Sequence, residues 1–236
     1  MQINAIDEYN SNGHLIYADN FIGAYVRGKT QEEALKKFNS EIFQYCHWLD
    51  KKSEQFDCHI SIIQEKISEL QVCDADSDIL FDSEIPALTF DEYCSLKSIA
   101  LKSAKDFLSL YNSITNKTET TLSARKTFYG NAPLTAQEMY EHTKNVNKYY
   151  FGEIKVSATN EPDIYTCRLQ AFESLEKQTD FLSNTVYDGI YEEQWSLRKV
   201  CRRFVWHDRI HAKAMYRMAT KLCGLDSVAN PFNFIL

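Results

Sequence analysis

"WHDRIHAKAMYR", residues 206–217, places His207 and His211 four positions apart in a stretch with helical periodicity. Because an α-helix turns once in about 3.6 residues, side chains four positions apart lie on one face, close enough to share an ion. The spacing permits a metal site but does not require one, since such pairs also occur on solvent-facing helix surfaces. A third ligand from elsewhere in the chain has to decide between these interpretations.

The helix around this pair is predicted to run from about 192 to 223, with Gly224 ending it. With Arg198 at zero and roughly 100° per residue, a buried apolar stripe falls between about 200° and 260°. His207 and His211 fall near about 180° and 220° on this scale, so the pair points into the protein. The stripe comprises Leu197, Val200, Phe204, Met215, Met218 and Leu222.

Three further helical patterns precede this one, and together the four predict a four-helix bundle. Thr89 and Thr135 stand where an N-cap is expected, and Thr135 is followed three residues later by Glu138, as in a capping box. Pro162 falls in the first turn of the next helix, where proline is tolerated. The predicted ranges are 89–114, 135–154 and 161–184.

The residues before this helical region show a different pattern. Alternating apolar residues predict strands at 4–9, 13–19 and 57–67, and Thr30 opens a helix over about 31–49. The acidic segment 72–88 is interpreted as a linker or an edge strand. The predicted fold class is therefore α+β, with a small N-terminal α/β sheet module (1–85) followed by an all-α four-helix bundle (86–236).

The composition limits the classes of function. The 236 residues carry a net charge of −7, which argues against a general nucleic-acid binder, because such proteins neutralise phosphates with basic residues. No leader-like segment and no apolar run long enough for a membrane span is visible, so a cytoplasmic location is expected. The seven cysteines form no C-x-x-C pair and are interpreted as reduced thiols.

His142 is the candidate for the third ligand. In the helix predicted for 135–154 it shares a face with Met139, Val146 and Tyr150, so it is expected to face the core. One histidine together with an inward H-x-x-x-H pair is the ligand count of an open catalytic metal site. Three imidazoles suit zinc, nickel or iron(II).

Charged residues near these histidines have two interpretations each. Arg203, one turn before His207, could meet a substrate carboxylate at the rim of the site. Asp208 and Glu138 could orient a ligand imidazole through its second nitrogen, or form ordinary ion pairs. Most bases between Arg198 and Arg217 are expected on a solvated face. Trp206 is expected to pack against the N-terminal module.

Two resemblances follow from these motifs. "GKTQEEALKKFNSEI" within residues 13–45 resembles the HicB-like antitoxin fold, whose small sheet serves partner contact or dimerisation. "YEHTKNVNKYY" and "FVWHDRIHAKAMYR" make residues 89–223 similar to the DinB-like superfamily of metal-binding four-helix bundles, with His142, His207 and His211 at its ligand positions. That resemblance implies a divalent ion with water in the remaining positions, and a thiol-dependent S-transferase or isomerase activity.

Three functions stay open at this point. A metal site without a protein nucleophile favours an enzyme that binds a small thiol and passes its sulfur to an electrophile. Metal-dependent hydrolysis would use the same three ligands. The third function is a non-catalytic regulatory protein, in which the HicB-like module binds a partner or forms a homodimer. The substrate in the first two is a small molecule, and neither nucleic acid nor a membrane is an expected partner.

Overall fold

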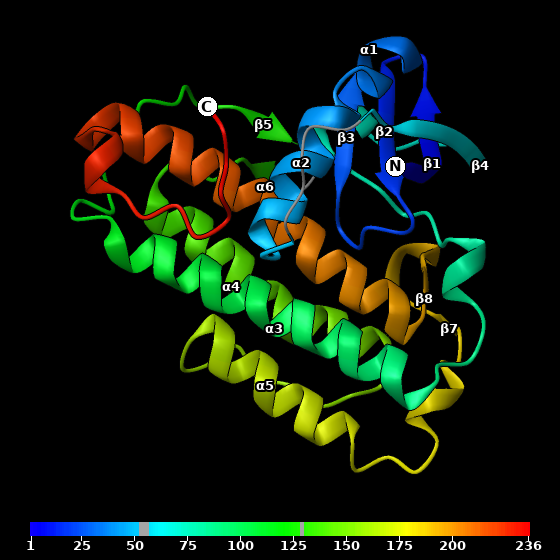
Figure 1. Cartoon of the computed structure of the whole chain (residues 1–236). Helices are drawn as coiled ribbons and strands as arrows, with labels where there is room; N and C mark the ends of the chain where they lie inside the picture. Colours follow the sequence, from blue (N-terminus) through cyan, green and yellow to red (C-terminus); the bar gives the residue numbers. More distant parts are fainter. Residues whose placement is uncertain (52–56, 128–129) are drawn as a thin grey trace.

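The N-terminal part of the chain forms four strands: β1 (Gln2–Asn10), β2 (Gly13–Ala18), β3 (Tyr25–Gly28) and β4 (His59–Ile67). The structure is a computed structural model that describes residues 1–51, 57–127 and 130–236 (Figure 1). The strands form one sheet in the order β3-β2-β1-β4, antiparallel except for the parallel pair β1 and β4. A parallel pair needs a crossover connection, which contains two helices here.

The helix predicted over 31–49 is divided into α1 (Gln31–Leu35) and α2 (Phe38–Trp48). Thr30 caps α1 as predicted, because its Oγ1 accepts a hydrogen bond of 3.2 Å from the amide of Glu33. The first turn of α1 lies directly against the end of β3. A Cβ on Gly28 would come within 2.5 Å of the amide nitrogen of Ala34, so glycine is required at this close approach.

Both faces of the central strands β1 and β2 are covered by the chain itself, whereas β4 exposes one face. One face packs on α1 and α2, and the other packs on residues 72–84, which we call the strap. The strap was predicted as a linker or edge strand, but it forms no strand and lies across the sheet with Val72, Ile79 and Phe81 buried. Burying these three apolar side chains favours covering the face over extending the edge.

The second half of the chain is helical, so the fold is mixed, with a small N-terminal sheet followed by helices. Helix α3 (Phe90–Ser113) and helix α4 (Ala136–Glu153) begin with the capping boxes of Thr89 and Thr135. Helix α5 (Ile164–Leu175) is shorter than the predicted 161–184, because Asp163 caps its first turn and a turn follows Leu175. None of the described helices is long and apolar enough to cross a membrane.

Helix α6 (Leu197–Cys223) starts later than predicted, because residues 187–195 contain short strands instead. These strands, β7 (Tyr187–Asp188) and β8 (Gln194–Trp195), pair with each other, and a similar pair, β5 (Lys126–Thr127) and β6 (Gly130–Asn131), precedes α4. Ser196 then caps α6 by accepting from the amide of Lys199. The end of α6 before Gly224 agrees with the prediction.

Helix α6 lies between the sheet and the other helices, as Figure 1 shows. Its basic residues were predicted to face solvent, but Lys199, Arg202 and Arg209 are buried. Their charges are compensated by carboxylates, because an unpaired buried charge would cost several kcal/mol. The pairs are Lys199 with Glu193, Arg202 with Glu84 and Arg209 with Glu41, at N···O distances of 2.9, 2.5 and 2.6 Å.

The hydrophobic core continues from the sheet through α2 and α6 into α3, α4 and α5. Trp206 of α6 packs against Tyr17 and Tyr25 of the sheet, which confirms its predicted contact with the N-terminal module. At Gly23 the turn after β2 touches α6 so closely that a Cβ would lie 2.6 Å from Val205 Cγ1. This core is continuous between residues 1–85 and residues 86–236. The division into two domains at this boundary stays a prediction.

The pair between Arg202 and Glu84 predicts a large effect of substitution. Arg202→Met leaves the buried Glu84 carboxylate without its partner, and we expect a loss of about 3–5 kcal/mol in the free energy of unfolding. The double variant Arg202→Met with Glu84→Gln should recover part of this loss. Arg217→Met, at an exposed position of α6, should stay within about 0.5 kcal/mol. Urea denaturation measures all three, and equal losses in Arg202→Met and Arg217→Met would contradict the prediction.

Glu8 is a fully buried carboxyl of β1 that faces the strap. It accepts hydrogen bonds from the Ser68 and Ser77 hydroxyls and from the amide of Asp78. Burial, together with the nearby Asp78 carboxylate, raises the pKa of Glu8 to about 7. The protonated form is therefore the one that the folded chain favours.

This raised pKa predicts the pH dependence of stability. Glu8 binds its proton more tightly in the folded chain, so its contribution is present below about pH 4.5 and is lost as the pH rises to about 7. Relative to Glu8→Gln, the natural chain should lose roughly 3 kcal/mol over this range. Denaturant titrations between pH 4 and 8 measure the difference, with the exposed Glu32→Gln as control. Parallel pH profiles of the natural chain and Glu8→Gln would refute it.

Candidate metal centre

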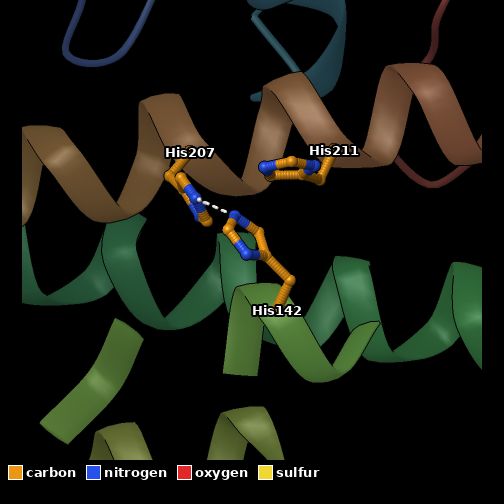
Figure 2. A group of neighbouring side chains, drawn as sticks. All are labelled: His142, His207 and His211. Carbon is orange, nitrogen blue, oxygen red and sulfur yellow. Dashed lines mark hydrogen bonds between the residues drawn. The ribbon is translucent and has the colours of Figure 1, made fainter. Parts of the chain in front are cut away.

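Helices α4 and α6 bring three histidines together, as Figure 2 shows. His207 and His211 project from successive turns of α6, and His142 reaches them from α4. The ring centroids of His142 lie 5.0 Å from His207 and 4.7 Å from His211, and the latter two are 4.5 Å apart. One ligand nitrogen of each lies within 4.8 Å of the other two. The three residues predicted as ligands therefore do converge.

The spacing of the nitrogens fits a single ion. His142 Nε2 and His207 Nε2 are 3.2 Å apart. Nitrogens bound at about 2.1 Å lie roughly 3.0 Å apart at right angles and roughly 3.4 Å apart at the tetrahedral angle. Without an ion, one of these two nitrogens must carry a proton for the contact to be attractive. The donor set, three neutral imidazoles, is the kind that zinc, nickel and iron(II) accept.

The surroundings keep these imidazoles neutral. Loss of hydration where the three rings lie close together lowers the pKa of each of them, well below the usual value for His207 and to about 3 for His211. Neutral rings keep a lone pair for a metal at physiological pH. Because unfolded histidines bind protons near pH 6.5, the metal-free chain should lose stability as the pH falls below that value.

The cluster is partly open to solvent. His207 is 9% exposed and His211 is half-buried, while His142 is exposed. His142 was predicted to face the core. The buried face of α4 is centred on Thr143, Asn147 and Tyr150, so His142 lies at the margin of that face. A ligand therefore has access to the cluster from the α4 side.

Glu138 and Asp208 do not orient the histidines. Glu138 accepts hydrogen bonds from the amides of Leu134 and Thr135, because its place at the third position of α4 makes it the capping-box partner. Both oxygens of Asp208 accept from the guanidinium of Arg168, at 2.6 and 3.1 Å. His207 Nδ1 is buried without a partner among the described residues.

Arg168 was missed in the sequence, although its position carries a signal. It lies four residues after Ile164 and three before Ala171, both buried, so it falls on the core face of α5. Its guanidinium is completely buried, pairs with Asp208 and stacks over the Phe204 ring at 4.0 Å. The pair links α5 to α6 beside His207.

Arg203 lies near the cluster as predicted, one helical turn before His207. Its guanidinium carbon is 4.6 Å from the centre of the Trp206 ring and 5.6 Å from that of Tyr150. Tyr150, which is buried, also packs against His207, with 6.2 Å between the centres of the two rings. An aromatic side chain thus connects the arginine with the ligands.

Comparison of the chain with protein-family models, with curated proteins and with solved structures finds no match. The HicB-like and DinB-like resemblances therefore stay predictions from the quoted motifs. What supports a metal site is the convergence of three imidazoles from two helices.

We expect His142→Ala, His207→Ala and His211→Ala each to lower the affinity for a divalent ion by orders of magnitude, because each removes one of three ligands. His142 is exposed, so His142→Ala should leave the stability of the metal-free chain nearly unchanged. The exposed His47→Ala and His59→Ala are the matched controls.

Elemental analysis after equal dialysis against zinc, nickel or iron(II) measures the bound ion per chain. One ion in the natural chain and in both controls, and none in the three site variants, is the expected pattern. Natural stoichiometry in the site variants would show that residues 206–217 form only a helix.

Proposed function

We propose that this chain is a DinB-like divalent-metal-binding protein and acts as a metal-dependent enzyme on a small thiol. The observation that carries the proposal is the cluster of His142, His207 and His211, with access from one side. The DinB-like motifs support the same ligand set, on the helices α4 and α6 that pack against each other. Helices α3 and α5 pack against this pair, as a four-helix bundle requires.

The ligand set favours an anionic substrate atom. In the part of the chain that the structure describes, the cluster contains histidines only, so the protein adds no negative charge. A divalent ion held there keeps its full charge and supplies a Lewis acid that favours a thiolate near neutral pH. Tyr150 and the buried helix interface restrict water on one side, while the exposed His142 leaves room for the thiol to enter and for an electrophile to approach its sulfur.

The N-terminal module supports this role more than a separate binding role. Both faces of β1 and β2 are covered by α1, α2 and the strap, and Glu41 and Glu84 of the module pair with bases of α6. We infer that the module positions the helix that carries His207 and His211. Partner binding through the sheet would have to use an edge strand, β3 or β4, or the exposed face of β4.

Thiol binding is tested with cobalt(II) in place of the natural ion, because a cobalt–thiolate contact gives a charge-transfer band in the near ultraviolet. Titration of the cobalt-loaded chain with mercaptoethanol should produce this band with saturation. Since Cys73, Cys94 and Cys223 are exposed, His207→Ala treated identically is the control for cysteine–cobalt contacts. Cobalt binding without any band would argue against thiol chemistry and for the hydrolase alternative, which uses the same ligands.

A further inference from the structure

Arg203 differs from the other bases of α6 in its charge compensation. Five of them form ion pairs with carboxylates, and Arg217 and Lys221 are exposed to water. Arg203 is half-buried and has no carboxylate partner in the described part of the chain. The paired bases are Arg198, Lys199, Arg202, Arg209 and Lys213.

Three acids of the chain act on the charge of Arg203 without pairing with it, namely Glu193, Glu8 and Asp76. Glu193 pairs with Lys199 at 2.9 Å, and Glu8 accepts from the hydroxyls of two serines. The guanidinium therefore has no direct carboxylate partner among the described residues beside the candidate metal centre.

The donors of Arg203 are not equivalent. Nη1 donates to the carbonyl oxygen of Ser77 in the strap at 2.7 Å, which fixes the orientation of the guanidinium. Nε is enclosed and has no partner among the described residues. Nη2 is not among the enclosed atoms, so it is the donor most open to a ligand, although the Tyr150 hydroxyl lies close to the same side chain. The rings of Trp206, Tyr150 and Trp195 hold the group in place.

The position of this donor relates it to the three histidines. Arg203, His207 and His211 follow one another at intervals of four residues, so about 6 Å along the helix separates the arginine from the first ligand. Tyr150 contacts both Arg203 and His207 from the opposite helix. A molecule of a few carbon atoms could contact both the metal position and Nη2.

We propose that Arg203 binds the carboxylate of the substrate, so that the substrate is a small mercapto-carboxylate with its sulfur at the metal position and one carboxylate oxygen at Nη2. This inference rests on the proposed function. A carboxylate fits better than a phosphate, because only one donor of the fork is accessible and a phosphate gains most from two. The contact would also give Arg203 a direct carboxylate partner, which it lacks among the described residues.

The test compares 3-mercaptopropionate with the uncharged 3-mercaptopropan-1-ol as ligands of the cobalt-loaded chain. A charge-assisted hydrogen bond at a half-exposed site should make the acid bind about tenfold more tightly. Arg203→Gln should remove this preference, leaving the affinity for the alcohol and the cobalt content unchanged. Arg203→Lys keeps the charge and should retain part of the preference, and Arg217→Gln should retain all of it.

The outcomes separate this inference from the proposed function. Absence of bound cobalt, or of a charge-transfer band with either ligand, contradicts the proposed function. Binding of the carboxylate alone is therefore also measured without metal. Propionate is added to the natural chain and to Arg203→Gln, and the changes in amide chemical shifts are recorded. An Arg203-dependent response, with or without metal, supports the inference. Equal binding of acid and alcohol, with no Arg203-dependent response to propionate, overturns it. Thermal melts verify that both Arg203 variants are folded.

Discussion

The structure depends on the burial of a strongly basic helix. Helix α6 is in contact with the sheet on one side and with α3 and α4 on the other, so its apolar stripe and several of its bases are removed from water. The buried bases are tolerated because each forms an ion pair with a carboxylate. Arg209 pairs with Glu41 and Arg202 with Glu84, both from the N-terminal half, and Lys199 pairs with Glu193 just before the helix. Some of the chain's excess of acidic side chains, these three glutamates, are therefore buried inside the molecule.

The strap contributes to the same arrangement through its backbone. The carbonyl oxygens of Ser77, Asp78 and Ile79 accept hydrogen bonds from Arg203, Lys199 and Arg202, in that order. Three consecutive carbonyls thus satisfy donors on one side of α6, while apolar strap residues cover the sheet. The strap links the sheet with the first half of α6, directly before the ligands.

The histidine cluster destabilises the metal-free chain, and metal binding would offset this loss of stability. His207 is buried with one nitrogen unpartnered, and its other nitrogen faces His142 Nε2 at 3.2 Å. Enclosed polar atoms without partners destabilise a fold, and such atoms often mark functional sites. A metal ion would use the lone pairs that meet in the cluster, and its binding energy would add to the stability of the folded chain. In the same region Arg203 has no direct carboxylate partner among the described residues.

The sequence by itself determined most of the elements and indicated the convergence of the three histidines. Periodicity and capping residues such as Thr89 and Thr135 act within a few positions, so they located β1, β2, β4 and the long helices, and the four-residue spacing placed His207 and His211 on one face. Only the tertiary structure decided which charges are buried, because that depends on what packs against a helix. Arg202 and Arg209 looked like solvent-facing bases until Glu84 and Glu41 covered them. His142 likewise moved from the predicted core to an exposed margin, since packing against α5 and α6 sets the rotation of α4.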